Sequence, residues 1–313
     1  MTDDGLTREQ AAEILREAVP GAEVTGVVRL VGGGVSGAYE VLCADPEQNV
    51  VIKVYGDREG WRLSKEISVY RLLRQHGVTK IPRLLTGAGS DGLLGRAYLV
   101  MSKLRGVAAD RLSPEMSDAD LRSLYRQMGE LVAQIHTISQ EAYGYRGTEI
   151  IDPQPTNEAC MKSVLARASG AYLEATGDRE LYEAAREYVS ARTELFALCE
   201  APVLIHNDFH EGNIIVEQTV DGPVISGVID VENAMAGDPI VDLSKTHSYS
   251  IRGSQVKLEG LFEGYGGAIV EWERRFRLFQ MVHLFELWGF FYGREPGTPE
   301  GIIEDIRGLI AAG

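Results

Sequence analysis

A polar loop between two apolar segments constrains this chain more than any other part of its sequence. Residues 203–205 and 214–215 are apolar, and the loop between them carries Asp208 and, five residues later, Asn213. A further apolar run ends at Asp230, seventeen residues beyond Asn213. An Asp, an Asn and a second Asp at these spacings are typical of sites that transfer a phosphoryl group. The alternative is that they are ordinary turn residues, since Asp and Asn are common between strands.

The residue types fit the chemistry that the spacing predicts. Asp208 would accept the proton of an attacking hydroxyl and orient that hydroxyl toward the γ-phosphate of ATP. Asn213 and Asp230 would supply oxygen ligands to Mg²⁺, a hard cation that completes its shell with water and phosphate oxygens. The sequence therefore predicts a kinase site that uses ATP and Mg²⁺.

A glycine-rich segment near the N-terminus predicts a phosphate-binding hairpin. Gly32, Gly34 and Gly37 fit the pattern G-x-G-x-x-G, with an apolar strand before them and an alternating strand after them. In dinucleotide-binding folds a helix follows such glycines, so the strand favours a hairpin whose backbone N–H groups approach phosphates. Taken alone, the segment is equally compatible with an ordinary glycine-rich turn.

A lysine inside an apolar strand needs a partner. Lys53 stands within the β-branched run of residues 50–54, where an unpaired charge is costly. The best partner is Glu66, on a helix predicted from about residue 62 to 76. A strand lysine that reaches the phosphates of ATP and pairs with a helix glutamate is typical of kinases. The alternatives are a lysine on an edge strand and a solvated glutamate.

These segments together resemble the aminoglycoside phosphotransferase and choline-kinase-like branch of the protein-kinase-like fold. The resemblance extends from about residue 25 to 295, and its most specific part runs from His206 to Leu243. Protein kinases carry D-F-G and A-P-E signatures, whereas this chain reads Asp230-Val231-Glu232 and has no A-P-E. The resemblance therefore points to small-molecule kinases.

The resemblance also implies roles for further residues. Ser36, in the glycine-rich hairpin, would face the β-phosphate of ATP. The carbonyl of Ser102 and the amide of Leu104 would pair with the adenine edge. His206 and Asp242 would brace the catalytic loop rather than take part in the chemistry.

Two glutamates are candidates for the acceptor site. Glu211 lies beside Asp208, where the family often has proline, and it could face a cationic substrate or be a solvated loop carboxylate. Glu286 interrupts an apolar helix predicted over residues 270–292. In the antibiotic kinases that the chain resembles, acidic residues of the C-terminal lobe often hold substrate ammonium groups.

The predicted fold is of the α+β class, a protein-kinase-like fold with two lobes. A small N-terminal lobe, residues 1–101, would contain an antiparallel β-sheet and a helix. A larger, mainly α-helical C-terminal lobe, residues 102–313, would contain the catalytic and substrate sites, with a hinge at about residues 101–105. Residues 7–18 are predicted to form a capped helix, and residues 143–157, with their glycines and prolines, a loop.

The charge and cysteine content of the chain limit its expected binding partners and its location. A formal net charge of −15 disfavours nucleic acid and anionic membrane surfaces as partners and favours a cationic substrate. The expected partner is a small molecule, polar or cationic, with no nucleic acid and no membrane. The N-terminus lacks the apolar core of a signal peptide, and the three cysteines lack a metal-binding spacing. We therefore expect a cytoplasmic protein, either a monomer or a homodimer.

The leading prediction is a resistance-type kinase that phosphorylates a hydroxyl group of an aminoglycoside or a similar polar antibiotic. A metabolic kinase for choline, homoserine or a sugar-like acceptor is the alternative among enzymes. A nucleotide-binding protein without turnover is the third interpretation, and the intact set of predicted site residues argues against it.

Overall fold

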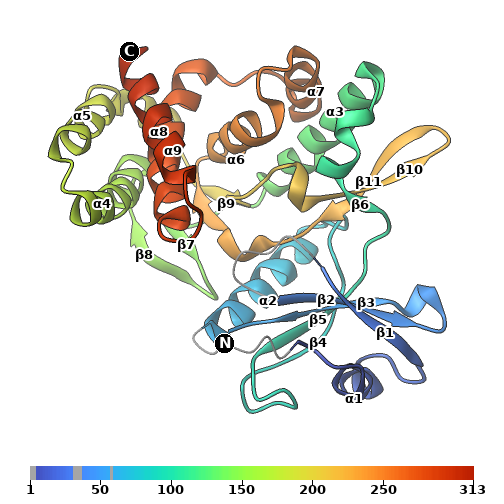
Figure 1. The fold of residues 1–313 in the computed structure, drawn as a ribbon. Helices are drawn as coiled ribbons and strands as arrows, with labels where there is room; N and C mark the ends of the chain where they lie inside the picture. Colours follow the sequence, from blue (N-terminus) through green and yellow to red (C-terminus); the bar gives the residue numbers. More distant parts are fainter. Residues whose placement is uncertain (1–4, 31–36, 57–58) are drawn as a thin grey trace. The chain divides into compact units, whose positions relative to one another are not determined.

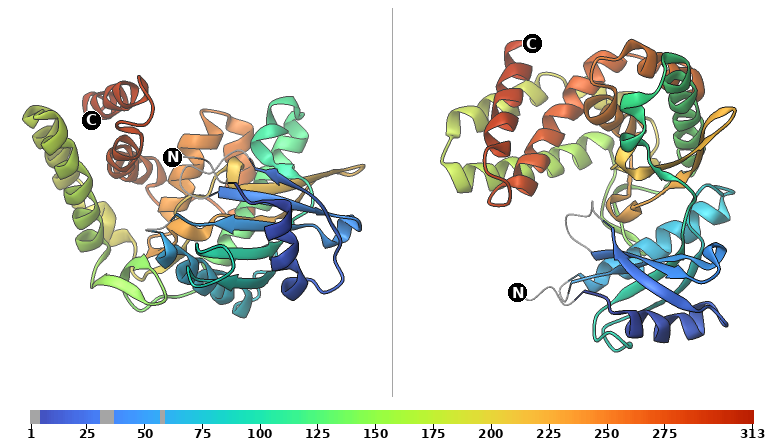
Figure 2. Two further views of the ribbon diagram at one scale, coloured as in Figure 1. Left: turned by 60° about the horizontal axis from the view of Figure 1, so that its bottom comes forward. Right: turned by 45° about the vertical axis from the view of Figure 1, so that its right-hand side comes forward.

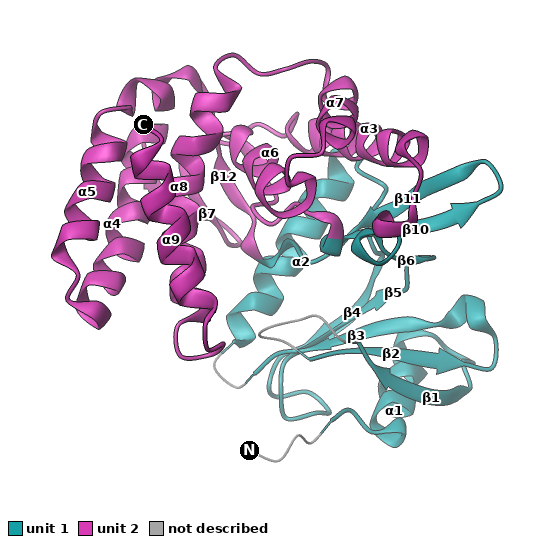
Figure 3. Ribbon diagram, turned by 45° about the horizontal axis from the view of Figure 1, so that its top comes forward, with its two compact units in different colours: residues 1–112, 212–232 teal, residues 113–211, 233–313 magenta. Residues whose placement is uncertain are grey.

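The computed structural model describes residues 5–30, 37–56 and 59–313, and the chain divides into two compact units (Figure 3). Unit 1 comprises residues 1–112 and 212–232, and unit 2 comprises residues 113–211 and 233–313. The predicted lobes are two continuous stretches of chain that meet after residue 101. The units are defined by packing, and each combines two separate stretches, so the lobe boundary stays a prediction.

Unit 1 contains a five-stranded sheet in the order β1-β2-β3-β5-β4 (Figure 1). All of its neighbouring strands are antiparallel, which confirms the predicted N-terminal sheet. The strands are β1 (Val24–Arg29), β2 (Gly37–Cys43), β3 (Val50–Val54), β4 (Leu84–Ala88) and β5 (Tyr98–Ser102).

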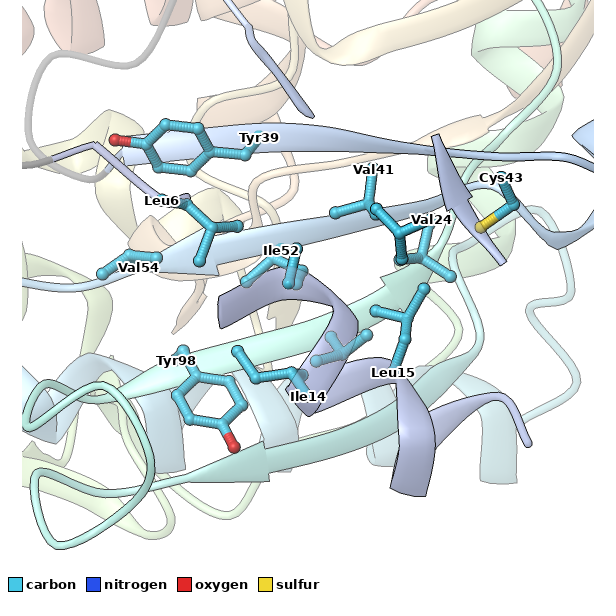
Figure 4. Packing of buried hydrophobic residues seen from close by; sticks show 13 residues of the cluster. Leu6, Ile14, Leu15, Val24, Tyr39, Val41, Cys43, Ile52, Val54 and Tyr98 are labelled. Atoms are coloured by element: carbon cyan, nitrogen blue, oxygen red, sulfur yellow. The ribbon is translucent and has the colours of Figure 1, made fainter. Parts of the chain in front are cut away.

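Helix α1 (Arg8–Ala18) covers one face of this sheet. Its buried Ile14 packs into one core cluster with Ile52 of β3, as Figure 4 shows from close by. The helix begins with the predicted capping box, in which the Thr7 side chain accepts from the Gln10 amide and the Gln10 side chain accepts from the Thr7 amide. Full burial of an isoleucine side chain stabilises the fold by about 1.5–3 kcal/mol, so this contact anchors the helix.

Helix α2 (Gly60–Gln75) belongs to a second cluster, where Leu63 packs with Leu99 and Met101 of β5. Val100, between those two strand residues, belongs to the cluster of α1 instead. Side chains alternate between the two faces of a strand, so α1 and α2 cover opposite faces of the sheet. This packing fixes α2 relative to the central strands.

A second, three-stranded sheet explains why residues 212–232 group with the N-terminal part of the chain. Strands β10 (Ile214–Thr219) and β11 (Gly222–Val228) form a hairpin, and β10 also pairs with β6 (Val107–Ala108). The backbone of Val228 donates a further hydrogen bond to the carbonyl of Lys80.

Unit 2 is mainly helical, as the sequence predicts. Its α-helices are α3 (Asp118–Ile135), α4 (Asn157–Thr176), α5 (Arg179–Ser190), α6 (Ile240–Thr246), α7 (Gln255–Tyr265), α8 (Trp272–Phe291) and α9 (Thr298–Ala311). Helix α6 continues directly into a π-helical turn, η7 (His247–Ile251). Figure 2 shows the yellow-green helices α4 and α5 beside the red helices α8 and α9. Among the residues described, no helix combines the length and apolarity needed to cross a bilayer.

Residues 143–157 do not form the loop that the sequence predicts. They contain a hairpin, β7 and β8, and β7 pairs with β12, which in turn pairs with β9. These strands are β7 (Tyr143–Arg146), β8 (Ile150–Gln154), β9 (Val203–Ile205) and β12 (Met235–Gly237). Gly144 has a φ of 149°, and a Cβ there would lie 2.9 Å from the carbonyl oxygen of Ile151. This glycine is therefore needed inside the hairpin, where it does not mark a loop.

Candidate active site

The ammonium of Lys53, on β3, contacts three carboxylates within unit 1. Its Nζ lies 2.5 Å from Glu66 Oε1, 2.8 Å from Asp230 Oδ1 and 2.9 Å from Glu232 Oε2. Burial alone would lower the pKa of Lys53, but these three negative charges raise it well above its ordinary value. The predicted pair of Lys53 and Glu66 therefore forms, and two further carboxylates join it.

Each of the two carboxylate oxygens of Glu66 accepts a hydrogen bond. It lies on α2 with 1% of its surface exposed, and the hydroxyl of Tyr55 donates to its second oxygen, Oε2, at 2.5 Å. A buried carboxylate is costly unless its oxygens are hydrogen-bonded. Lys53 and Tyr55 together meet that requirement, so the position of Glu66 fixes the position of the Lys53 ammonium.

The two predicted metal ligands of unit 1 lie at the same end of the β10–β11 hairpin. The amide of Ile229 donates to the carbonyl of Asn213 at 3.0 Å, which places Asp230 next to Asn213. Asp230 has a φ of 63°, in the left-handed region. Non-glycine residues are uncommon in this region, and such strained positions cluster at functional sites.

Carboxylates of a kind that suits a divalent cation surround the Lys53 ammonium. Carboxylate oxygens of Glu66, Asp230 and Glu232 lie within 4.8 Å of one another. Oxygen donors of this kind suit Mg²⁺. Glu232 also accepts from Arg62 Nη1 at 2.8 Å, so both of its oxygens are bound to cations. Sequence reasoning missed Glu232, whose one signal is a second carboxylate two residues after Asp230.

The loop that carries Asp208 belongs to unit 2 and is braced by a buried carboxylate. Asp242, on α6 and fully buried, accepts from the amide of His206 at 2.8 Å and from the amide of Asn207 at 2.6 Å. His136 Nε2 lies 3.0 Å from the same carboxylate. The bracing role that the resemblance implied for Asp242 is confirmed by these contacts.

Successive turns of α6 and η7 hold the rest of this loop. Thr246 donates from its hydroxyl to the carbonyl of Phe209 at 2.7 Å, and the Ser250 hydroxyl accepts from the amide of Glu211 at 2.9 Å. Residues four apart lie on one face of a helix, so Asp242, Thr246 and Ser250 form one polar stripe. The loop therefore follows the helix along its length.

The carboxylate of Asp208 is partly exposed, with 27% of its side-chain surface accessible, and lies 3.5 Å from His210 Nε2. Burial would raise the pKa of Asp208, but the hydrogen bond and charge of His210, with the charges of Lys245 and His206, hold it well below its ordinary value. Asp208 is therefore ionised at neutral pH and able to accept a hydrogen bond from a hydroxyl.

Glu211 is occupied by protein partners. Its carboxylate accepts from the hydroxyls of Tyr125 at 2.7 Å and Ser113 at 3.0 Å, and from Lys257 Nζ at 2.9 Å. With 7% of its surface exposed it is not a solvated carboxylate, so that alternative is wrong. Its contact with a cationic substrate stays a prediction, and its contacts favour a role in bracing the loop.

Glu286 remains available for contacts outside the protein. Its side chain on α8 is 28% exposed, and one of its oxygens lies 3.4 Å from His283 Nδ1. Burial raises the pKa of Tyr249, and the charges of Asp208 and Glu286 raise it further. Both carboxylates therefore act on the same ring in unit 2.

The remaining predicted nucleotide contacts are only partly described. Gly32, Gly34 and Ser36 lie outside the described residues. Gly37 begins β2, and Leu104 is half-buried. Ser102 exchanges two hydrogen bonds with Arg83, through its amide and its hydroxyl, each at 2.9 Å. The adenine contacts of Ser102 and Leu104 stay predictions.

Comparison with known families gives one match that spans most of the chain. The model of the phosphotransferase enzyme family matches residues 27–278. This range includes Lys53, Asp208 and Asp230, and it ends before Glu286.

Solved structures share the fold at low sequence identity. The aminoglycoside phosphotransferase APH(4)-Ia has a TM-score of 0.72 and 16% identity, with 98% of this chain and 99% of that chain covered. The GDP and kanamycin complex of APH(2")-IIia gives 0.67 and 18%, with 96% and 98% covered. A protein assigned as a fructosamine-3-kinase, from Haemophilus somnus 129PT, gives 0.67 and 14%, with 96% of each chain covered. At these identities the likeness shows a kinase-like fold alone.

Proposed function

Because this chain belongs to the phosphotransferase enzyme family, we propose that it is an ATP-dependent kinase that transfers the γ-phosphoryl group to a hydroxyl of a small molecule. The observation that carries this proposal is the Lys53 ammonium held by Glu66 and Asp230. A fixed cation on a strand, beside carboxylates that suit Mg²⁺, is the arrangement with which kinases bind the phosphates of a nucleoside triphosphate.

The described residues divide the work of transfer. Lys53 binds the phosphates of ATP, and Glu66 holds Lys53 in place. The oxygen of the acceptor hydroxyl bonds to the γ-phosphorus, and the bond between this phosphorus and the leaving ADP oxygen breaks. Asp208 accepts the proton that the hydroxyl loses. Asn213 and Asp230 would hold Mg²⁺. When bound, the metal neutralises charge on the phosphate oxygens.

The proposed acceptor is an aminoglycoside or a similar polar antibiotic. The net charge of −15 favours a cationic acceptor, and Glu286 offers a partly exposed carboxylate in unit 2, which also contains Asp208. Two of the similar structures are aminoglycoside phosphotransferases, and one of them is a kanamycin complex. We place the enzyme in the cytoplasm, a reducing compartment in which its three cysteines would stay free thiols.

A sugar-like metabolite is the second candidate acceptor. The structural likeness to an assigned fructosamine-3-kinase favours it over choline and homoserine. A nucleotide-binding protein without turnover would need the partly exposed, ionised Asp208 to have no chemical role.

The test is acceptor-dependent release of ADP from Mg-ATP, with pooled aminoglycosides, other polar antibiotics, choline, homoserine and sugars as acceptors. Asp208→Asn should lower kcat by about 10²- to 10⁴-fold and leave nucleotide affinity unchanged. Asp305→Asn, an exposed position on α9, is the matched control and should keep full activity. Wild-type turnover by Asp208→Asn would overturn the role of Asp208. ATP binding without turnover on any pool would favour the non-catalytic interpretation.

A further inference from the structure

Lys245 is a buried lysine on α6 that the proposed chemistry does not use. It is 8% exposed, and its Nζ donates to the carbonyl oxygen of Asn207 at 2.6 Å and to Asn207 Oδ1 at 2.8 Å. Burying an ammonium is costly unless hydrogen bonds replace those of water. A leucine or methionine would fill the same space in a helix core at lower cost, so the charge itself needs an explanation.

Asn207 is the residue on which this charge acts. It has a φ of 61°, in the left-handed region, and is 4% exposed. Its amide donates to Asp242 Oδ1 at 2.6 Å, and its side-chain Nδ2 donates to the carbonyl of Asn233 at 3.1 Å. With the two contacts to Lys245, each polar group of Asn207 has a partner. The residue is therefore held in its uncommon conformation from three sides.

The contact to the carbonyl of Asn207 reaches the next residue directly. That carbonyl and the amide of Asp208 belong to the same planar peptide group. A hydrogen bond that fixes the direction of the carbonyl therefore fixes the direction in which the backbone enters Asp208.

We propose that Lys245 is a positioning residue for phosphoryl transfer, which holds Asp208 in the orientation that the reaction needs through its two hydrogen bonds to Asn207. The inference rests on the proposed function of Asp208. Positioning is the main contribution of the protein to phosphoryl transfer, and a misplacement of about 1 Å can cost about 100-fold in rate.

The charges around Lys245 agree with this role. Burial lowers the pKa of its ammonium, and the charges of Glu286, Asp208 and Asp242 oppose that effect. In return, the charge of Lys245 is one of those that keep Asp208 ionised. These negative charges partly offset the cost of burying the ammonium.

The experiment compares Lys245→Met and Lys245→Gln with Tyr172→Phe. Methionine fills the space without a donor, and glutamine keeps an uncharged NH₂ donor group on a shorter side chain. Tyr172→Phe removes a buried hydroxyl of α4 that donates to Asp178 and serves as the control for lost stability. Lys245→Met should lower kcat by about 100-fold with little change in the KM for ATP, and Lys245→Gln should lower it less. Tyr172→Phe should keep kcat.

Hydrogen exchange of the amides of residues 206–208 supplies a second measurement, which needs no acceptor. These amides should exchange faster in Lys245→Met and Lys245→Gln than in Tyr172→Phe. If Lys245→Met does not fold, Lys245→Gln decides both measurements. If the wild-type enzyme has no turnover, the proposed function fails, and exchange alone still tests the hold on Asn207. Wild-type kcat in a folded Lys245 variant, or exchange no faster than in the control, would overturn the inference.

Discussion

Single charged residues in this enzyme have several partners each. Lys53 contacts three carboxylates, and Asp242 accepts from two backbone amides and lies beside His136. When one member of such a buried group is removed, the others keep their charge and lose their compensation. Substitutions in these groups should therefore change both ligand affinity and the free energy of unfolding. Variants that keep the size of the side chain and remove only its charge separate the two effects best.

The first prediction concerns the negative charge that Glu232 adds beside the predicted metal ligand Asp230. Glu232→Gln keeps the size of the side chain and removes one of three neighbouring carboxylates, so the Mg²⁺ concentration for half-maximal ATP binding should rise by about tenfold or more. Titration of nucleotide binding with Mg²⁺ measures this. Glu259→Gln, at a surface ion pair with Arg122, is the control and should have no effect. An unchanged Mg²⁺ dependence in Glu232→Gln would exclude this role.

The second prediction concerns pH and Asp242. Burial would raise the pKa of Asp242, but the hydrogen bond and charge of His136 and the charge of His206 lower it. A carboxyl with a lowered folded-state pKa stabilises the fold fully above its unfolded pKa of about 3.9, and this stabilisation is lost as pH falls through the folded-state pKa.

Asp242→Asn should therefore lower the free energy of unfolding at pH 7 by roughly 3 kcal/mol. Below about pH 4 the wild type should lose this advantage, so the two stability curves should converge. Urea titrations between pH 7 and pH 3 measure both curves, with Asp305→Asn as the exposed control. Curves that stay parallel down to pH 3 would contradict the role of the ionised Asp242.

At the scale of elements, helices α3 and α7 approach with their backbones almost in contact. A Cβ at Gly264 would lie 1.8 Å from the carbonyl oxygen of Arg126, and one at Gly129 would lie 2.3 Å from that of Leu261. Glycine on both helices is the sequence feature that permits this approach. Helix α3 supplies Tyr125, and α7 supplies Lys257, the partners of Glu211, so this packing also supports the catalytic loop.

The third prediction tests this packing. Gly264→Ala should lower the free energy of unfolding by about 3 kcal/mol, because backbone atoms must move to admit the methyl group. Gly170→Ala, on α4, has no atom within 4 Å of the added Cβ and is the matched control. It should be neutral or stabilise by up to about 1 kcal/mol, since alanine favours helix. Equal effects of the two substitutions in denaturant titrations would argue against close contact.

At the scale of the whole molecule, acidic residues outnumber basic ones by 46 to 31, which gives the net charge of −15. A field of this sign attracts cations and repels anions, and salt screens it. The charge therefore bears on the class of acceptor more directly than on the fold.

The fourth prediction follows from this field. If the acceptor is a polycationic antibiotic, its KM should rise several-fold as ionic strength rises from about 0.1 to 1 M, where the Debye length falls from about 10 to about 3 Å. A neutral sugar acceptor measured in parallel should show little change. A KM for the cationic acceptor that does not depend on salt would show that its binding does not use the net charge.

The sequence by itself determined the parts of this protein that depend on local spacing. The Thr7 capping box and the strand lysine with its helix partner Glu66 were both predictable. Each rests on residues close in the chain or on a chemical requirement that few side chains can meet, such as a partner for a buried lysine.

Only the tertiary structure decided which distant residues complete the site. Glu232 beside Lys53, Lys245 beneath Asn207 and the hairpin over residues 143–154 depend on contacts with elements far away in the chain. The sequence gives little sign of these contacts, because the periodicity of a helix or strand predicts which residues are buried and does not predict their contact partners. The same reason explains the grouping of residues 212–232 with unit 1, which a backbone pairing with β6 produces.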